Sequence, residues 1–454
     1  MTNVIVERKE RADTVAALLK RLEDREARIA IMGLGYVGLP LAAAVHNANL
    51  EVLGFDIDDS KISRLQAGLS PVGTVPDEIV REMAKSGRFQ ATSDAARLSD
   101  ADVIIICVPT PLDRHRNPDL SYIVKTAETI KPVLRRGQMV VLESTTYPGT
   151  TDEVVKPILE TSGLSVGTDF LLAYSPERED PGNPQFETAT IPRVVGADEE
   201  ASRRAAELLY RQIVKNVMLV SSTRAAEAVK LTENIFRSVN IALVNELKLI
   251  YGKMGVNIWE VIEGAKTKPF GYMPFYPGPG LGGHCIPIDP FYLTWKAREY
   301  DVPTRFIELA GEVNTRAPRE VVAALSEALG RRSRKSVNGA RILLIGLAYK
   351  KNVDDMRESP ALVILEDLEA RGATVEFYDP FIPTVPMTRE HAPLAGRESV
   401  SWAADVLQGF DAALICTDHD DIDYQQLVDN VPIVADARNA TRDIVRNRDR
   451  IVQV

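Results

Sequence analysis

The stretch RIAIMGLGYVGLPLAAAVHNANLEVLGFD, residues 28–56, decides the fold of this chain. Its pattern predicts a strand, a glycine-rich turn, a helix over residues 39–47 and a second strand that ends in an acidic residue. The turn places Gly33, Gly35 and Gly38 in the GxGxxG spacing. A lone GxGxxG is weak evidence, but in this order of elements it indicates a dinucleotide-binding Rossmann fold.

The same turn predicts the cofactor. Glycines let a pyrophosphate reach the free amides at the helix start, where the helix dipole favours an anion. Asp56 stands about 20 positions after the glycines, where a ribose-binding carboxylate is expected, and it would repel a 2′-phosphate, so NAD is favoured over NADP. Tyr36 and Val37 lie within the turn. Lys61 is either a contact near the adenosine or a solvated helix lysine.

Composition sets limits on function. With 454 residues the chain has room for two or three domains, and 45% hydrophobic and 26% charged residues are typical of a globular protein. A net charge of −10 argues against non-specific nucleic-acid binding. Three distant cysteines and histidines without metal spacing predict no disulfide framework, no metal site and a reducing cytoplasm. We expect no signal peptide, and no apolar run approaches the roughly 18 residues of a membrane span.

Strands and helices continue to alternate after the glycine turn. Three further apolar runs predict buried strands, and a polar tail ends each run. These are residues 101–108 with VPTP from residue 108, 138–143 with STTYP from 144, and 170–175 with SPERE from 175. Because ligands bind beyond the carboxyl ends of parallel strands, we expect all three tails on the cofactor side. Cys107 is expected to be an inert core thiol.

Residues 221–255 predict one long helix. Lys230, Asn234 and Arg237 share one face at helical spacing, together with Ile241. An amine, an amide and a guanidinium suit a reacting oxygen or a phosphate, whereas the alternative is a solvated helix face. A second stripe predicts packing against another helix, from this chain or from a second subunit: Val229, Ile235, Val239 and Leu243.

The segment PGPGLGGHCIPIDP, residues 277–290, is too rich in glycine and proline to form a helix or a strand. It predicts a rigid loop with exposed backbone and Cys285 near its end. Asp289 follows four residues later and is placed to hold a water. The alternative is a surface loop with a buried, inert thiol. We interpret His284 as a structural or substrate contact rather than a base.

After a basic linker at residues 331–339, the pattern predicts a second doubly wound unit without a GxGxxG. Its long polar turn carries Lys350 and Arg357 and leads into a helix at Pro360. Cys416 is expected in the core. The predicted strands are residues 341–347, 375–378, 412–417 and 433–435. The fold class is therefore α/β, with two doubly wound Rossmann-like domains joined by a central helical region with one long helix. The predicted domains are an N-terminal helical arm (residues 1–27), an NAD-binding Rossmann domain (28–220), a central helical region with the cysteine loop (221–330) and a C-terminal Rossmann-like domain (331–454).

Several of these segments together resemble the UDP-glucose/GDP-mannose dehydrogenase family, over residues 28–440. The similar stretches are GLGYVG, VPTP, ESTTYPGTT, YSPEREDPGNP, AAEAVKLTENIFRSVN, PGPGLGGHCIPIDP and AYKKNVDDMRESP. Within the family the chain looks most like the bacterial branch that acts on UDP-N-acetylglucosamine in polysaccharide synthesis. The resemblance implies an NAD domain, a helical dimerisation region and a UDP-sugar domain in a cytoplasmic homodimer or higher homo-oligomer.

The resemblance also implies a four-electron oxidation of a C6 alcohol through a cysteine thiohemiacetal and thioester. The implied catalytic residues are Cys285, Lys230, Asn234, Asp289, Glu177 and Thr145. The implied sugar-nucleotide contacts are Glu177, Arg178, Glu179, Lys230, Asn234, Arg237, Lys268, Gly280, Tyr349 and Lys350. Thr110, Thr145 and Arg357 match cofactor contacts. The chain departs from the UDP-glucose branch of the family at two positions. Pro181 stands where that branch has a second acid, and Lys268 is a substitute for an arginine of that branch.

Three alternatives stay open from the sequence. In the first alternative, the same chemistry acts on UDP-N-acetylmannosamine or UDP-glucose rather than on UDP-N-acetylglucosamine. A two-electron dehydrogenase would stop at the aldehyde and would not need the thiol. A non-catalytic NAD-binding regulator or scaffold would keep the fold, although Cys285, Lys230 and Asp289 together speak against it.

Overall fold

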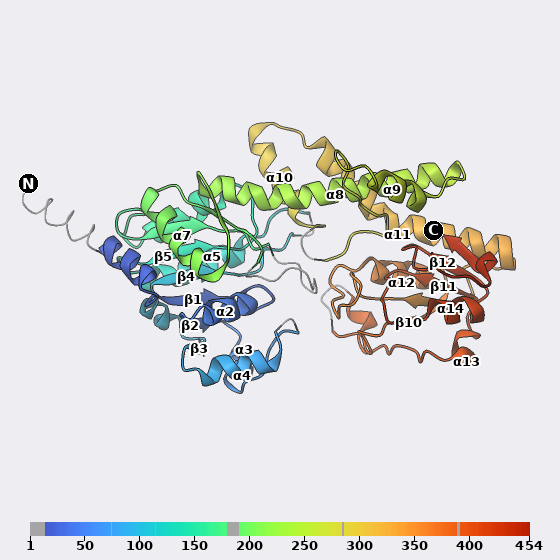
Figure 1. Ribbon diagram of the computed structural model, residues 1–454, viewed down its shortest axis with the longest axis horizontal. Helices are drawn as coiled ribbons and strands as arrows, with labels where there is room; N and C mark the ends of the chain where they lie inside the picture. Colours follow the sequence, from blue (N-terminus) through green and yellow to red (C-terminus); the bar gives the residue numbers. More distant parts are fainter. Residues whose placement is uncertain (1–13, 74, 114, 179–189, 284–285, 388–390) are drawn as a thin grey trace, which may run out of the picture. The chain divides into compact units, whose positions relative to one another are not determined.

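The computed structural model describes residues 14–73, 75–113, 115–178, 190–283, 286–387 and 391–454. The chain divides into two compact units. The first comprises Met1–Glu233 and Phe291–Val302, and the second comprises Asn234–Pro290 and Pro303–Val454. Each unit has its own sheet with helices packed against it (Figure 1).

The described residues of the first unit form an eight-stranded sheet in the order β3-β2-β1-β4-β5-β6-β7-β8. Neighbouring strands are parallel, except that β6 and β7 are antiparallel. This doubly wound order confirms the predicted Rossmann domain. The strands are β1 (Arg28–Met32), β2 (Glu51–Phe55), β3 (Phe89–Thr92), β4 (Val103–Ile106), β5 (Met139–Leu142), β6 (Leu171–Tyr174), β7 (Arg193–Gly196) and β8 (Val217–Val220).

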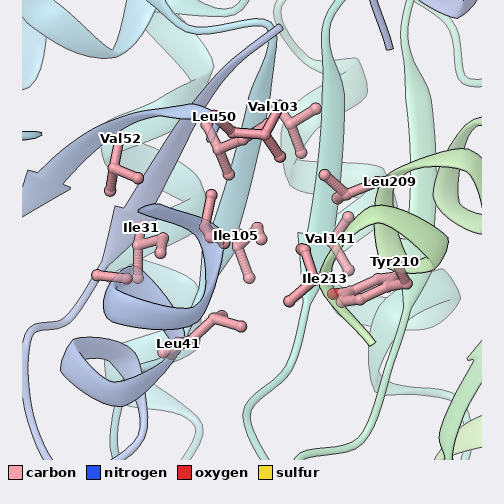
Figure 2. Close-up of a cluster of buried hydrophobic side chains, with 14 of the residues drawn as sticks. Ile31, Leu41, Leu50, Val52, Val103, Ile105, Val141, Leu209, Tyr210 and Ile213 are labelled. Atoms are coloured by element: carbon pink, nitrogen blue, oxygen red, sulfur yellow. The ribbon is translucent and has the colours of Figure 1, made fainter. Parts of the chain in front are cut away.

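The central strands are apolar on both faces because helices cover both sides of the sheet. On one face, Ile31 and Ile105 are partners in the register and pack with Leu41 and Tyr210 (Figure 2). Fully burying such side chains contributes about 1.5–3 kcal/mol each. The helices of this unit are α2 (Gly38–Asn47), α3 (Asp59–Gln66), α4 (Asp77–Lys85), α5 (Ser121–Ile130), α6 (Lys156–Glu160) and α7 (Glu200–Ile213), with short helical turns at Ala95–Asp100, Lys131–Val133 and Thr151–Val155.

Residues 14–23, part of the predicted N-terminal arm, form a helix. Its Leu18 and Leu22 are buried in the same core as the first sheet. The Gln212 side chain donates a hydrogen bond to the Leu22 carbonyl. This helix is therefore integrated into the first unit.

The long helix α8 spans Thr223–Lys253, close to the predicted residues 221–255. It is followed by α9 (Ile258–Lys266), α10 (Asp289–Ala297), a helical turn at Arg298–Tyr300 and α11 (Arg305–Ser333). Helix α11 continues into the predicted linker, which therefore starts at Arg334, where the backbone turns left-handed with φ +55°. Across the described residues, no helix combines the length and apolar character needed to cross a membrane.

The second sheet, over the described residues, has the order β10-β9-β11-β12-β13, with every pair parallel. This is the second common doubly wound order and confirms the predicted second unit. Pro360 is the first residue of its helix, and Ser359 caps that helix. The elements are β9 (Arg341–Ile345), α12 (Pro360–Ala370), β10 (Thr374–Tyr378), α13 (Ala404–Leu407), β11 (Ala412–Ile415), α14 (Tyr424–Asn430), β12 (Val434–Asp436) and β13 (Ile451–Gln453), with helical turns at Ala392–Leu394 and Arg448–Arg450.

The two described cysteines are core residues, as predicted. Cys107 and Cys416 are 9% and 1% exposed. Burial raises the pKa of the Cys416 thiol to about 12, so this thiol stays protonated and unreactive.

Candidate active site

The glycine turn after β1 has the geometry that a dinucleotide site needs. Gly33 has φ +95°, and a Cβ there would lie 2.5 Å from the carbonyl oxygen of Cys107. A Cβ at Gly38 would lie 1.8 Å from the Gly33 oxygen, so helix α2 starts in close contact with the turn. At Gly35 nothing lies within 4 Å of the Cβ position. Open space beside uncapped amides at the start of α2 fits the pyrophosphate of NAD.

Asp56 lies beside this turn, just beyond the end of β2. Its Oδ2 accepts a hydrogen bond from the Leu34 N–H at 2.9 Å, and its Oδ1 accepts from the Asp58 N–H at 3.0 Å. The Lys61 ammonium group contacts Oδ2 at 3.0 Å. Lys61 is therefore an ion-pair partner of the acid rather than a solvated lysine. Asp56 is buried, at 5% exposure, and both of its carboxylate oxygens already accept hydrogen bonds.

The turns after β4 and β5 are tied together at the carboxyl edge of the sheet. The Ser144 hydroxyl accepts from the Val108 N–H at 3.0 Å and donates to the Val108 carbonyl at 2.8 Å. Thr145 follows and is partly buried. The Thr110 carbonyl accepts a hydrogen bond from the Tyr292 hydroxyl of α10. The predicted grouping of these polar tails at one edge agrees with the parallel pairing of β4 and β5.

Helix α8 presents two charged residues to the turn after β6. Lys230 is 4% exposed, and its Nζ contacts the Glu177 carboxylate at 3.1 Å and the Glu177 carbonyl at 2.5 Å. Glu233 pairs with Arg178 at 2.5 Å. Lys230 is thus part of a buried ion pair, and the interpretation of a solvated helix face is wrong for this residue.

One turn further along α8, Asn234 is fully buried. Its amide nitrogen donates to the carboxylate of Asp289, the first residue of α10, and its oxygen accepts from Arg237. Asp289 is 4% exposed, whereas Arg237 is exposed overall. The two buried groups form an acid–amide pair whose acid stands four residues after the predicted nucleophile.

Gly283, in the described part of the cysteine loop (residues 277–290), packs closely against the polar turn after β9. A Cβ at Gly283 would lie 2.9 Å from the Tyr349 ring, and the Gly283 N–H donates to the Arg357 carbonyl at 3.1 Å. The Arg357 guanidinium contacts Asp355 at 2.6 Å. Bulk at this glycine would therefore displace the tyrosine or the loop.

The start of the cysteine loop is held by buried amides. The Gly278 N–H donates to Asn245 on α8 at 3.0 Å, and the Asn245 side chain donates to Asn314 on α11 at 3.2 Å. Gly280, with φ +145°, packs against Pro318 and Pro360. The predicted exposure of the loop backbone is wrong for Gly278 and Gly283, which are buried, because neighbouring side chains of the same unit pack against these glycines.

The other predicted contacts lie as follows. Lys350 is partly buried in the turn after β9. Lys268 follows α9 and is exposed, with its ammonium group 5.1 Å from the centre of the Phe270 ring. Cys285, His284, Glu179 and Pro181 lie outside the described residues.

Sequence reasoning missed two acids on α8. Glu233 pairs with Arg178, and Glu227 is a fully buried carboxyl group. Both stand three residues from Lys230, so helical spacing alone places them on neighbouring turns of the same side. That spacing was visible in the sequence, but the turns that these acids contact were not.

A NAD-type Rossmann domain, a long helix with a buried lysine and a second doubly wound domain define a class of nucleotide-dependent dehydrogenases. The UDP-glucose/GDP-mannose dehydrogenase family matches three parts of the chain: its NAD binding domain at residues 27–214, its central domain at 224–316 and its UDP binding domain at 343–443. The chain belongs to this family and is an NAD-dependent dehydrogenase of UDP-sugars.

Two of the similar relatives are named for different sugars. The chain is 38% identical over 360 residues to the UDP-N-acetyl-D-glucosamine 6-dehydrogenase of Pseudomonas aeruginosa, covering 79% of this chain and 84% of that protein. It is 36% identical over 424 residues to the UDP-N-acetyl-D-mannosamine dehydrogenase of Pyrococcus horikoshii, covering 92% and 96%. A solved structure of the UDP-D-ManNAc dehydrogenase from Pyrococcus horikoshii has a TM-score of 0.82, with 91% of this chain and 96% of that chain covered. The resemblance to the family is confirmed.

Proposed function

We propose that the enzyme oxidises the C6 hydroxyl of UDP-N-acetylglucosamine to a carboxylate, as a step in polysaccharide precursor synthesis. The observation that carries this proposal lies on α8. Lys230 and Asn234 are one turn apart, both are buried, and they contact the acids Glu177 and Asp289 respectively. Asp289 stands four residues after Cys285, so the sequence links this group to a thiol.

A nucleophile is needed because two hydrides must leave the same carbon. The first oxidation converts the alcohol into an aldehyde, with the hydroxyl proton passing to a base. The Cys285 thiolate then forms a C–S bond to the aldehyde carbon, and loss of the second hydride turns the thiohemiacetal into a thioester. Water breaks the C–S bond and releases the carboxylate and the thiolate. When bound, NAD accepts the hydride in each oxidation, so two molecules are consumed per sugar.

The buried groups suit these steps. The Lys230 ammonium stabilises the oxyanion or alkoxide, aided by the Asn234 amide, and burial strengthens this attraction because water is excluded. Asp289 orients or deprotonates the attacking water. Thr145 and Glu177 hold that water or assist proton transfer.

The remaining predicted residues bind the two ligands. Arg178, Arg357 and Lys61 each contact an acid, so each meets its ligand as part of an ion pair. The proposed cofactor contacts are Gly33, Gly35, Tyr36, Val37, Gly38, Asp56, Lys61, Thr110, Thr145 and Arg357. The proposed sugar-nucleotide contacts are Glu177, Arg178, Glu179, Lys230, Asn234, Arg237, Lys268, Gly280, Tyr349 and Lys350.

A second candidate substrate is UDP-N-acetylmannosamine, which differs from the first in configuration at C2. The mannosamine dehydrogenase of Pyrococcus horikoshii supports it, because that relative matches 92% of this chain against 79% for the glucosamine enzyme. The chemistry at C6 would be the same.

Turnover of the purified enzyme on three UDP-sugars tests the proposal. With NAD present, we expect kcat/KM for UDP-N-acetylglucosamine to exceed that for UDP-N-acetylmannosamine and UDP-glucose by about 10-fold or more. A preference for UDP-N-acetylmannosamine would replace the sugar and keep the chemistry. No NADH from any of the three would contradict the proposed function.

We also propose that the enzyme is a homodimer that pairs through α8. Phe236, Leu243 and Ile250 recur every seven residues and are 48%, 52% and 44% exposed. This exposed stripe differs from the predicted one, in which Val229, Ile235 and Val239 are partly buried. An exposed apolar stripe with a seven-residue repeat on a long helix is typical of a surface that packs against a second copy of the same helix.

Light scattering tests the dimer. We expect Leu243→Glu together with Ile250→Glu to convert dimers into monomers, because charges would be buried in an apolar interface. Thr232→Glu, on an exposed polar position of the same helix, is the matched control and should stay dimeric. A dimeric Leu243→Glu/Ile250→Glu variant would rule out this interface.

A further inference from the structure

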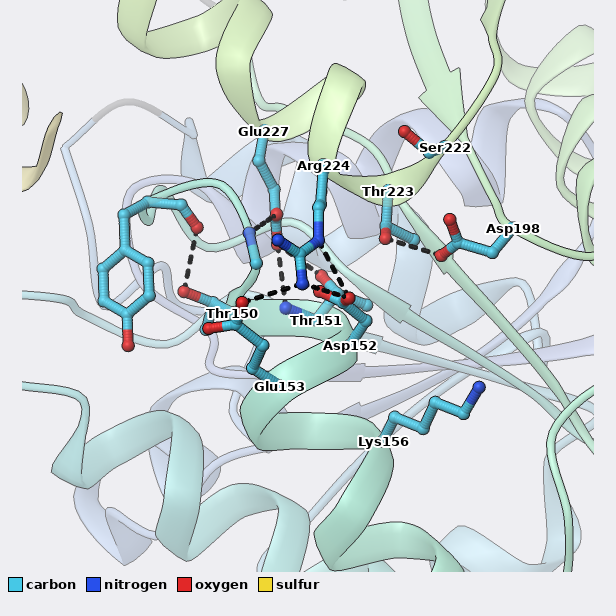
Figure 3. A network of polar contacts seen from close by, with 12 residues as sticks. Thr150, Thr151, Asp152, Glu153, Lys156, Asp198, Ser222, Thr223, Arg224 and Glu227 are labelled. Atoms are coloured by element: carbon cyan, nitrogen blue, oxygen red, sulfur yellow. Dashed lines mark hydrogen bonds and ion pairs between the residues drawn. The ribbon is translucent and has the colours of Figure 1, made fainter. Parts of the chain in front are cut away.

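Glu227 of α8 is a fully buried carboxyl group that contacts the turn after β5 (Figure 3). Its Oε2 accepts from the Gly149 N–H at 2.6 Å. Its Oε1 accepts from the Thr151 N–H at 2.9 Å and from the Thr151 hydroxyl at 2.7 Å. Burying a carboxyl group is costly unless donors surround it, so these three donors indicate a position organised around this acid.

The contacted residues begin a helix. The π-helical turn Thr151–Val155 leads directly into α6, and its N-cap, Thr150, makes no side-chain capping bond. The first amides of a helix need acceptors, and here Glu227 supplies them from a different helix. Single π-helical turns are rare and are frequent at functional sites.

Two positively charged side chains, one from α8 and one from α10, contact the same turn. Arg224, one turn before Glu227 on α8, contacts Asp152 at 2.8 Å and Glu153 at 2.7 Å (Figure 3). Lys296 of α10 contacts Glu153 at 2.6 Å and is 4% exposed. The two cations balance the acids on the turn, so Glu227 is not simply one of several repelling carboxylates.

The turn that Glu227 holds carries a residue of the proposed mechanism. Its first end is fixed because Ser144 exchanges two hydrogen bonds with Val108. Its other end is fixed by Glu227, and Thr145 lies between these two anchors. Lys230 follows Glu227 by three residues on α8, so the acid connects the helix that bears the lysine with the turn that bears the threonine.

We propose that Glu227 is a positioning residue that sets Thr145 relative to Lys230 and thereby supports turnover. The inference rests on the proposed function, because that function assigns roles to Thr145 and Lys230. Glu227 itself acts only through the turn. Above pH 8, where Glu227 is ionised, both carboxyl oxygens are acceptors for these donors, whereas a glutamine would place an NH₂ group against one of them, so the variants are compared in this pH range.

The test compares Glu227→Gln with Asp102→Asn in the full-length enzyme. Asp102 is the matched control because it is also a buried acid of the first unit, 3% exposed, and accepts from the Arg28 N–H at 2.9 Å. It precedes β4, at the opposite edge of the sheet from the turn. We measure kcat, KM for both substrates, NAD affinity by calorimetry, thermal midpoint and amide hydrogen exchange of the turn.

We expect Glu227→Gln to lower kcat by about 10- to 100-fold with NAD affinity within about 2-fold, because a small displacement of a reacting group has effects of this size. Exchange at residues 144–151 should rise. Asp102→Asn should keep kcat within about 2-fold even if its thermal midpoint falls. Equal kcat in Glu227→Gln and wild type, or equal losses in both variants, would overturn the proposal.

Two further measurements keep the result decisive. If Glu227→Gln does not fold, Thr151→Val removes one donor and leaves the acid in place, and unchanged kcat in that folded variant would overturn the proposal. Wild-type enzyme that turns over no UDP-sugar contradicts the proposed function instead. In that case the exchange data still report whether Glu227 holds the turn, and unchanged exchange would overturn this part.

Discussion

In both sheets the first strand is followed by a glycine with a positive φ, +95° at Gly33 and +81° at Gly346. In both, an acid after the second strand accepts hydrogen bonds from amides of that first turn. Asp56 accepts from the Leu34 N–H, and Asp379 accepts from the Leu347 N–H at 2.7 Å. The two nucleotide folds thus begin with the same local arrangement.

They differ in what else the acid contacts. Asp56 also binds Lys61, a side chain that is 33% exposed. Asp379 accepts from four backbone amides in all and from His419, whose other ring nitrogen accepts from the Asn352 N–H. Both members of the second pair are fully buried at their side chains. The first acid has a partly exposed lysine as its charged partner, whereas the second accepts all its hydrogen bonds from buried groups of its own domain.

The helix that follows the turn differs as well. Helix α2 starts at Gly38, five residues after the glycine of the first turn, whereas α12 starts at Pro360, fourteen residues after Gly346. A short turn brings helix amides to a pyrophosphate, and a long polar turn presents side chains such as Tyr349 instead. Two doubly wound sheets of different strand order, with the same first turn, therefore suit a dinucleotide in one domain and a different nucleotide ligand in the other.

The largest expected effect is a loss of catalysis that leaves ligand binding by both nucleotide folds unchanged. We expect Cys285→Ser to lower kcat by about 10³-fold or more, because a hydroxyl cannot replace the thiolate as nucleophile. Affinities for NAD and for the UDP-sugar, measured by calorimetry, should stay within about 2-fold. Lost binding with little change in kcat would instead show a structural cysteine.

A second prediction compares the two acids by stability. Asp379→Ala leaves buried donors without an acceptor and should lower the free energy of unfolding by about 3–5 kcal/mol. Asp56→Ala removes fewer contacts and should cost about 1–3 kcal/mol. Urea titrations of both variants give these values, and an Asp56 variant that loses as much as the Asp379 variant would break the comparison.

A third prediction concerns ligand binding. Asp56→Asn should weaken NAD binding by about 10-fold and reduce the preference for NAD over NADP, because it removes a charged acceptor for the ribose hydroxyls. Affinity for the UDP-sugar should not change. Calorimetric titration with NAD, NADP and UDP-sugar measures this, and unaltered NAD affinity would exclude the ribose role of this acid.

The smallest effect is a pH dependence of opposite sign in the two units. Burial raises the pKa of Glu227 from 4.5 to about 8, so its stabilising contribution is complete below pH 4.5 and is lost as the pH rises to about 8. Burial alone would raise the pKa of Asp379, but the hydrogen bonds from His419 and the backbone amides hold it below 3.8. Its contribution is present above pH 3.8 and is lost as the pH falls further.

Single-tryptophan variants can measure the two units separately. Trp295 packs against Tyr147 in the first unit, and Trp402 packs against Tyr378 in the second. From pH 5 to 8 the Trp295 signal should report falling stability, and Glu227→Gln should flatten this slope. A slope that persists unchanged in that variant would assign it to other groups.

The sequence predicted the elements that have strong local signals. Helix α2 spans Gly38–Asn47 against the predicted residues 39–47, and Pro360 begins its helix with Ser359 as cap, because apolar patterns and capping residues act locally. Strands β3, β7, β8 and β13 were not predicted. Three of them, β3, β8 and β13, are edge strands that are only partly buried, so they lack the continuous buried apolar run that marks the central strands. The predicted apolar stripe on α8 does not form one uniform face, because Val229 packs against a core cluster of the first unit whereas Leu243 is 52% exposed, a difference that helical periodicity does not reveal.

The candidate site was predicted in part. Helical spacing placed Lys230 and Asn234 together, and their burial agrees with a functional role. Their acid partners come from other parts of the chain. Nothing in the local sequence distinguishes Glu227 from a solvated helix glutamate, and only its contact with Gly149 does so. Long-range hydrogen bonds of this kind depend on tertiary packing and leave no local pattern.

The central claim is that one UDP-sugar molecule transfers two hydrides, each to an NAD molecule, before its product leaves the enzyme. Counting NADH formed per UDP-N-acetylglucosamine consumed, under single-turnover conditions with excess NAD, tests this most directly. The account predicts two NADH, a uronate product and no released aldehyde. One NADH per sugar with a free aldehyde would contradict the thioester route.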